Sequence, residues 1–153
     1  KKTRQPMNDF PPAARTAFQA FFPMTTRWRD NDVYGHINNA YYYEFFDTAA
    51  NRWLMQNSGL DLPNGPIVGL VAETACRFLS SVSYPQDLEV GLTTLRIGKS
   101  SVIFGMGLFA SGAEEAAALC RFVHVYVDQT TRRPTPIPET MVAALEAITP
   151  PAA

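Results

Sequence analysis

The chain has 153 residues and a formal net charge of −1; 46% of its residues are hydrophobic and 18% are charged. This length and composition predict one ordinary globular domain with a sizeable core. Sequence-independent nucleic-acid binding requires a basic face, so a near-neutral chain argues against a nucleic-acid partner. The two cysteines, Cys76 and Cys120, lie in apolar runs, and we expect buried free thiols in a reducing cytoplasm.

The start of the chain and its helical region argue against export and membrane insertion. No apolar stretch follows the basic start at residues 1–4, so we expect no secretory signal and a cytoplasmic location. The apolar helical region, about residues 39–56, carries Glu44, Asp47 and Arg52, and we expect no membrane span there. We assign residues 1–20 to an N-terminal tail, flexible over its first ten residues, and residues 21–149 to a single domain.

The elements expected in chain order are one strand, one long helix, four strands and one short helix. A strand is expected over 22–29, with Met24, Thr26 and Trp28 on one face. Apolar residues at helical spacing then predict a long helix, which Asn38 or Asn39 caps and Asn57-Ser58-Gly59 ends. From residue 67 onward the period of the apolar residues changes, and together with the turn residues it predicts strands over 67–78, 88–97, 101–110 and 117–128. A short helix is expected over 138–148.

This order predicts an α+β fold in which an antiparallel five-stranded sheet wraps around one long central helix, with a short C-terminal helix. One helix covers only one face of the sheet. The free strand edges and the other face are therefore left for a partner subunit, and we expect a homodimer or homotetramer.

The segment Asp30-Asn31-Asp32-Val33-Tyr34-Gly35-His36-Ile37-Asn38-Asn39 is unusually polar for the entry to an aromatic helix. Such a density of polar groups costs stability unless hydrogen bonding or function requires it. A helix N-terminus also offers free backbone N–H groups and the positive end of the helix dipole. The segment therefore predicts a site for a group that carries or develops negative charge.

Several familiar sites are excluded by spacing. Asp30-x-Asp32 begins like a calcium loop, but the twelfth position is Tyr41 where a glutamate is needed. Gly98-Lys99-Ser100 lacks the upstream glycine of a phosphate-binding loop, because Thr93 stands there. The cysteines and histidines lack the spacing of zinc ligands, so no metal is expected.

The pattern Asp-x-Asp-x-x-Gly-His-x-Asn-Asn-x-x-Tyr at residues 30–42 resembles the signature of hotdog-fold thioesterases of the 4-hydroxybenzoyl-CoA thioesterase and acyl-CoA thioesterase group. The resemblance extends over most of residues 22–147. It implies a hotdog fold and the hydrolysis of acyl-CoA thioesters to free acid and coenzyme A (CoA). It also implies that CoA enters only as part of the substrate and that no other cofactor is needed.

The resemblance also implies roles for the residues of the polar segment. Asp32 is the implied catalytic residue, acting either as nucleophile through a mixed anhydride or as general base on water. Backbone N–H groups around Asn38 and Asn39 would polarise the thioester carbonyl. His36 follows Gly35 in this variant of the motif, and it either hydrogen-bonds Asp32 or a water in catalysis or helps to cap the helix.

The remaining polar and aromatic residues have less specific expectations. Gly35 is expected to supply a positive φ or a close approach to the ligand, and Asp30 to form a turn or to pair with Arg27 or Arg29. Basic residues should meet the phosphates of CoA. The residues expected to contact the substrate are Tyr34, Gly35, Asn38, Asn39, Tyr41, Arg96 and Lys99.

Two polar residues in apolar strands have structural interpretations. Glu73 is expected to be an edge or paired carboxylate, and His124, which alternates with valines, a hydrogen-bonded sheet histidine. Other functions on the same fold stay open. They are a non-catalytic acyl-thioester binding module, a thioesterase for acyl-carrier-protein substrates, and a hotdog hydratase, although the chain lacks the Asn-Pro-x-His arrangement expected of the last.

Overall fold

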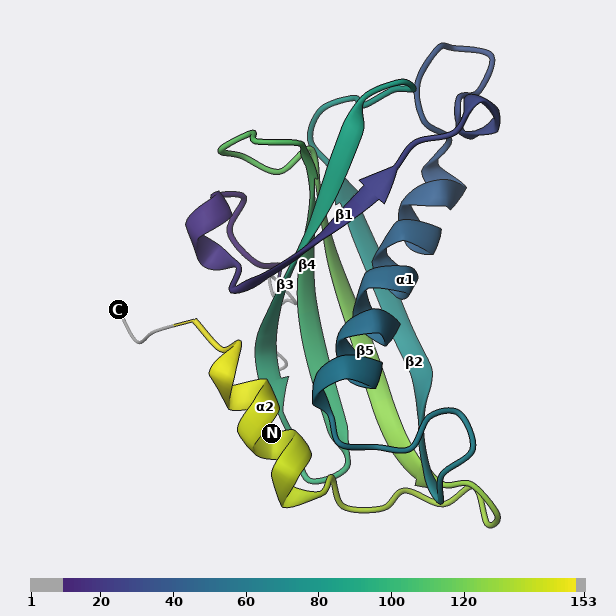
Figure 1. The fold of residues 1–153 in the computed structure, drawn as a ribbon, viewed down its shortest axis with the longest axis vertical. Coiled ribbons are helices and arrows are strands. Elements are labelled where there is room, and N and C mark those ends of the chain that lie inside the picture. The colour runs from purple at the N-terminus through teal and green to yellow at the C-terminus, as the bar shows by residue number, and fades with distance from the viewer. Residues whose placement is uncertain (1–9, 151–153) are drawn as a thin grey trace, which may run out of the picture.

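The computed structural model describes residues 10–150, which form two α-helices and a five-stranded sheet (Figure 1). The sheet has the order β1-β3-β4-β5-β2, and every neighbouring pair is antiparallel. This confirms the predicted α+β fold. The elements are β1 (Ala20–Thr25), α1 (Asn39–Asn57), β2 (Ile67–Phe78), β3 (Asp87–Ile97), β4 (Ser101–Ala110), β5 (Ala118–Asp128) and α2 (Glu139–Ala147).

The long helix α1 lies along one face of the sheet (Figure 1). Its N-cap is Asn38, whose side-chain Oδ1 accepts a hydrogen bond from the Ala40 N–H at 3.0 Å. It ends at Asn57, and Gly59 follows with a φ of 73°. Both ends agree with the predicted cap and stop. The buried face of the helix consists of Tyr42, Phe45, Phe46, Ala49, Ala50, Trp53 and Leu54.

The main core lies between α1 and the inner face of the sheet. Phe104 and Met106 of β4 are fully buried there, and Trp53 packs edge-on against Phe104 with ring centroids 5.9 Å apart. The buried residues of the sheet lie mostly in the central strands β3, β4 and β5. No helix within residues 10–150 is long and apolar enough to cross a membrane.

The described part of the predicted N-terminal tail packs on the outer face of the sheet, so the boundary after residue 20 is a correction. Gly91 and Gly107 are register partners in β3 and β4, and a Cβ atom on either would lie within 3 Å of Phe18 side-chain atoms. Phe18 fills this hollow and contacts Phe109 edge-on at 5.5 Å. Arg15 adds an ion pair with Glu89 at 2.8 Å. The flexible segment predicted for residues 1–10 lies outside the described residues except for residue 10.

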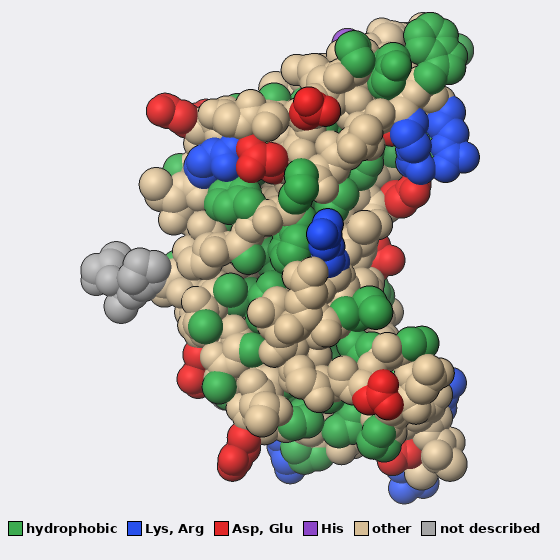
Figure 2. Space-filling view, in the orientation of Figure 1, with side chains coloured by type: hydrophobic (Ala, Val, Ile, Leu, Met, Phe, Trp, Pro, Cys, Tyr) green, Lys and Arg blue, Asp and Glu red, His purple; other side chains and the backbone are tan. Residues whose placement is uncertain are grey.

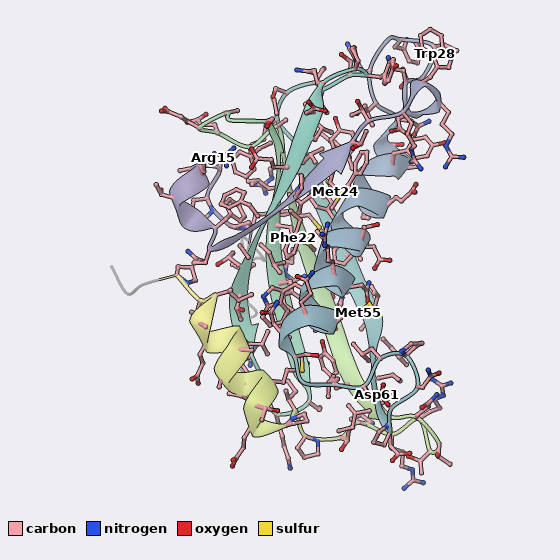
Figure 3. All side chains as sticks on the ribbon, viewed as in Figure 1. Arg15, Phe22, Met24, Trp28, Met55 and Asp61 are labelled. Atoms are coloured by element: carbon pink, nitrogen blue, oxygen red, sulfur yellow. The ribbon has the colours of Figure 1, made fainter. Side chains whose placement is uncertain are left out.

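The first strand ends earlier than predicted. β1 covers Ala20–Thr25, and a short 3-10 helix, Trp28–Asp30, replaces the last part of the expected strand. Met24 and Thr26 are both buried, but Trp28, which was expected on the same face, is 82% exposed (Figure 3). The physical reason is Asp30, whose buried carboxylate accepts a hydrogen bond from the Arg27 N–H at 2.8 Å and turns the chain out of the sheet.

Glu73 and His124, the two polar residues singled out in apolar strands, differ in whether they have a partner. Glu73 forms an ion pair with Arg121 at 2.8 Å across β2 and β5, which confirms the paired carboxylate. His124 is buried in β5, but neither ring nitrogen has a hydrogen-bond partner within residues 10–150, so the prediction of a hydrogen-bonded histidine was wrong. The valine alternation identifies the face on which His124 lies but cannot reveal what surrounds its ring.

Asp30 holds both ends of the loop between β1 and α1. Its side-chain Oδ1 accepts a hydrogen bond from Arg27 Nε at 3.0 Å, and its backbone carbonyl accepts from the Asn38 N–H at 2.8 Å. Asp30 is fully buried, while Arg27 reaches the surface and also contacts Glu44. The hydrogen bond to Asp30 raises the pKa of Arg27. Losing this buried carboxylate is costly, because the backbone N–H and Nε of Arg27 would be left without their acceptor.

We expect Asp30→Asn to lower the free energy of unfolding by about 1–3 kcal/mol, because the amide cannot accept from both Arg27 donors as the carboxylate does. Urea denaturation of the purified protein measures this loss. Asp61→Asn is the matched control, since its carboxylate is exposed and makes no hydrogen bond or ion pair within residues 10–150. Equal stabilities of the two variants would contradict the anchoring role of Asp30.

Candidate active site

A pocket of about 520 Å³ lies where the polar loop meets the first turn of α1. Three segments form it: the loop before the helix, the start of the helix, and the chain that leaves β2. Four of the predicted site residues therefore come together here, namely Asp32, His36, Asn38 and Asn39. The full lining is Asp32, His36, Ile37, Asn38, Asn39, Tyr42, Phe78, Leu79, Ser80 and Ser81.

A tight turn fixes Asp32 at the edge of this pocket. The Gly35 N–H donates to the Asp32 carbonyl at 3.2 Å, and the Asp32 N–H donates to the His36 carbonyl at 2.8 Å. Gly35 has a φ of 81°, which confirms the predicted positive φ. The carboxylate Oδ1 accepts from the Tyr34 N–H at 2.9 Å. No residue of the described range contacts Oδ2 as a hydrogen-bond or ion-pair partner, so this oxygen is available to a ligand or a water.

The start of α1 leaves one backbone donor free. The Asn38 N–H donates to the Asp30 carbonyl, and the Ala40 N–H donates to Asn38 Oδ1. The Tyr41 N–H donates to the Asn38 carbonyl at 3.0 Å. The Asn39 N–H finds no acceptor in the part of the chain that the structure describes. It lies at the positive end of the helix dipole, where an anionic oxygen is favoured.

The loop is also tied to the segment that follows β2. The Ile37 N–H donates to the Val82 carbonyl at 2.9 Å, and the Tyr84 N–H donates to Asn31 Oδ1 at 3.0 Å. These bonds bring residues 78–81 to the pocket wall, although they lie far after the loop in the sequence. Sequence analysis missed this wall, because no local pattern reports a contact of such separation.

Tyr42 lines the pocket, whereas the sequence analysis included it in the motif at residues 30–42 without giving it a role in the site. Its ring packs edge-on against Phe78 at 4.9 Å. Burial raises the pKa of Tyr42, and the nearby Asp32 carboxylate adds a smaller contribution in the same direction. The phenol therefore stays protonated at neutral pH. The available signal was its spacing, because residue 42 lies one helical turn after Asn38 and faces the same way.

His36 lines the pocket, and its side chain is exposed. Its imidazole makes no hydrogen bond to Asp32 or to any other residue between positions 10 and 150. Its backbone carbonyl, in contrast, is part of the Asp32 turn. The geometry thus fixes the position of the residue through its backbone and leaves the ring free to contact a ligand or a water.

The other predicted contact residues are not part of the pocket lining. Tyr34 is 81% exposed, and the Tyr41 ring lies beside the Arg27 guanidinium at 5.6 Å. Arg96 borders a separate cavity next to the end of α2, and the Lys99 carbonyl accepts from the Ile137 N–H at the opposite end of the sheet. A single protomer does not bring Arg96 or Lys99 to Asp32. Their contact with CoA phosphates stays a prediction that needs a second copy of the chain.

The charged side chains in Figure 2 and the potential metal ligands of residues 10–150 do not point to a second site. On the face drawn in Figure 2, acidic and basic side chains are interspersed rather than segregated. No group of three or more His, Cys, Asp or Glu side chains that could hold a metal ion occurs between residues 10 and 150. The independence of the site from metals stays a prediction.

Comparisons with known proteins identify the family of the chain. A sequence model of the thioesterase-like superfamily matches residues 26–145. Among curated proteins, the uncharacterized protein YsmA of Bacillus subtilis (strain 168) is 24% identical over 88 residues, which are 58% of this chain and 59% of YsmA. The chain thus spans about 59% of the length of this curated relative.

Two solved structures are similar to most of the chain. The PA5185 protein of Pseudomonas aeruginosa strain PAO1 is 44% identical with a TM-score of 0.88, and the match covers 94% of this chain and 100% of that one. A thioesterase of Thermus thermophilus, solved in complex with coenzyme A and Zn, is 28% identical with a TM-score of 0.72, and the match covers 84% of this chain and 98% of that one. The family match includes the polar loop, the helix start and the strands β2 to β5, and the chain therefore belongs to the thioesterase-like superfamily and has the hotdog fold.

Proposed function

We propose that the protein hydrolyses acyl-CoA thioesters to the free acid and CoA. Thioester hydrolysis follows from membership of the thioesterase-like superfamily, and CoA as the thiol is the further step. The similar Thermus thermophilus thioesterase in complex with CoA supports this step. The observation that carries the proposal is the pairing in one pocket of a carboxylate oxygen without a partner, on Asp32, with a free backbone donor, on Asn39.

The proposed reaction uses Asp32 as general base. Oδ2 takes a proton from a water molecule, whose oxygen attacks the carbonyl carbon of the thioester. The carbonyl oxygen becomes an anion and accepts a hydrogen bond from the Asn39 N–H, a contact worth roughly 3 kcal/mol in comparable sites. The C–S bond then breaks, the carbonyl re-forms as the free acid, and CoA leaves as a thiolate.

A nucleophilic route uses the same two groups. Here Oδ2 attacks the thioester carbon itself, CoA leaves, and water hydrolyses the mixed anhydride on Asp32. The two routes differ in one observable species. Rapid-quench mass spectrometry with the enzyme in excess detects an acylated chain only in the nucleophilic route. A mass increase equal to that of the acyl group would therefore contradict the general-base route and support the nucleophilic one.

A second copy of the chain is proposed to pair along the free edge of β2. β2 is twelve residues long and is the last strand of the sheet, and it exposes Leu70 and Val71 to 43% and 49%. The opposite edge strand, β1, has six residues and carries Pro23, which cannot donate to a neighbouring strand. β2 is thus the edge that is open to pairing.

This pairing would also border the catalytic pocket. β2 ends at Phe78, and Phe78 and Leu79 line the pocket while remaining 47% and 49% exposed. Two identical strands related by a two-fold axis run antiparallel, so each copy would present the same surface to the other. We therefore propose a homodimer, or a tetramer built from such dimers, in which the partner contributes to the pocket wall.

We expect Asp32→Asn to lower kcat/KM for acyl-CoA hydrolysis by about 10²–10⁴-fold, because the amide can neither accept a proton nor attack the thioester effectively. Thiol release measured spectrophotometrically gives the rate, and a panel of aryl and aliphatic acyl-CoA esters gives the best substrate. Asp61→Asn serves as control and should retain full activity. Wild-type turnover at background on every thioester of the panel, or full activity of Asp32→Asn, would contradict the assignment.

His36→Gln should cost less than Asp32→Asn, about tenfold or less in kcat/KM, because the exposed imidazole does not contact the Asp32 carboxylate. The same thiol-release assay compares the two variants across a range of pH around neutrality. A loss as large as that of Asp32→Asn, together with a changed pH dependence of kcat/KM, would instead make the ring an acid or base of the reaction.

Val71→Lys should weaken the proposed dimer, because it places a charge on the pairing edge. Sedimentation equilibrium at micromolar concentration should give at least twice the 16.9 kDa chain mass for the wild type and a shift towards one chain for Val71→Lys. Ser111→Lys adds the same charge at an exposed turn and should leave the mass unchanged. A wild-type mass of one chain would exclude the dimer.

A further inference from the structure

The Tyr42 phenol lies in the wall of the candidate active site, and the reaction proposed for Asp32 and Asn39 does not use it. Tyr42 lines the same pocket as these two residues. The residue is 4% exposed, and its ring packs edge-on against Phe78 at 4.9 Å. A phenol can both donate and accept a hydrogen bond, so the groups around its oxygen decide what it can do in the pocket.

The position of Tyr42 on α1 directs its side chain toward the start of the helix. Tyr42 follows Asn39 by three residues, so the two lie on the same face of the helix. Long helical side chains point back toward the N-terminus and cover the turn before their own Cα. The Tyr42 ring therefore extends toward the free Asn39 N–H, and its contact with Phe78 holds it at the pocket wall.

The groups around the Tyr42 hydroxyl make it a hydrogen-bond donor. Burial raises the pKa of this phenol, and the Cys76 thiol and the Asp32 carboxylate add smaller rises, so the hydroxyl keeps its proton at neutral pH. The backbone N–H of Val82 acts in the opposite direction and lowers the pKa. A backbone N–H near the phenol oxygen engages that oxygen as an acceptor, and the hydroxyl proton is then left to be donated.

The Asp32 carboxylate lies near this hydroxyl without contacting it. Its charge acts on the pKa of Tyr42, yet no hydrogen bond joins the two side chains, and Oδ2 has no partner among residues 10–150. The Tyr42 hydroxyl is also not one of the enclosed polar atoms without a partner, in contrast to the Tyr126 hydroxyl. A donor and an acceptor that border one pocket without contacting each other can share a water molecule.

We propose that the Tyr42 hydroxyl donates a hydrogen bond to the attacking water and holds it against Asp32 Oδ2. A water molecule has two hydrogens and two lone pairs. One hydrogen goes to Oδ2 and one lone pair accepts from Tyr42, which leaves the second lone pair for attack on the carbonyl carbon. Tyr42 keeps its proton throughout and is thus a water-positioning residue. This inference rests on the proposed thioester hydrolysis.

Tyr42→Phe tests this role, because it removes the hydroxyl and keeps the ring that packs against Phe78. We expect kcat for acyl-CoA hydrolysis to fall about tenfold to hundredfold, because the water loses its orientation, and KM to stay within about twofold. The urea midpoint of unfolding should stay close to that of the wild type. Tyr84→Phe is the matched control and should keep full activity, because its hydroxyl lies outside the pocket lining and its ring can still pack against Trp28.

A crystal structure of Asp32→Asn with a bound acyl-CoA distinguishes a contact with water from a contact with the substrate. We expect the Tyr42 hydroxyl to lie about 2.8 Å from an ordered water that faces the thioester carbonyl carbon. A Tyr42 hydroxyl that contacts the carbonyl oxygen itself would instead be a second oxyanion donor, and this would overturn the proposal.

The kinetic results distinguish a failure of this inference from a failure of the proposed function. Activity that is lost in Asp32→Asn but fully retained in Tyr42→Phe would overturn the role of Tyr42 alone. A raised KM with an unchanged kcat in Tyr42→Phe would also overturn it, because the hydroxyl would then contribute to substrate binding and not to the attack. Wild-type turnover at background on every thioester would overturn both.

Discussion

The attachment of the polar loop at Asp30 is the constraint on which the rest of the site depends. The Asp30 carboxylate accepts hydrogen bonds from Arg27, just after β1. The Asp30 backbone carbonyl accepts a hydrogen bond from the N–H of Asn38, the N-cap of α1. The loop therefore has two fixed ends, at Asp30 and at Asn38. Within that frame the tight turn at Asp32 has little freedom, and a carboxylate on such a turn can face the helix start without help from other side chains.

The site follows from how the remaining polar groups divide their hydrogen bonds. Asn38 satisfies the Ala40 N–H as a helix cap, and Asp32 Oδ1 satisfies the Tyr34 N–H. Oδ2 of Asp32 and the N–H of Asn39 are left without a partner among the described residues, as is the His36 ring. In the reaction that we propose, the first two groups serve as base and oxyanion donor. Structural hydrogen bonds would then fix the positions of both groups and leave them free for the substrate.

Much of the fold could be predicted from the sequence, because period and turn residues are local. The strands Ile67–Phe78 and Ser101–Ala110 match their predicted ranges to the residue, and the cap, Asn38, is one of the two predicted candidates. Asp32, His36 and the start of α1, which the motif indicated as site residues, line one pocket. The predicted end of β1 was wrong, because the burial of Asp30 depends on its tertiary contacts and not on the alternation of apolar and polar residues. The pocket wall after β2, and the unpartnered ring of His124, arise from distant residues that no local pattern specifies.

A crystal structure of Asp32→Asn with a bound acyl-CoA tests the proposed site most directly. We expect the thioester carbonyl oxygen to lie about 3 Å from the Asn39 backbone nitrogen and the carbonyl carbon to face the side chain at position 32. A thioester bound elsewhere, or a carbonyl oxygen held without the backbone donor at the start of α1, would contradict it.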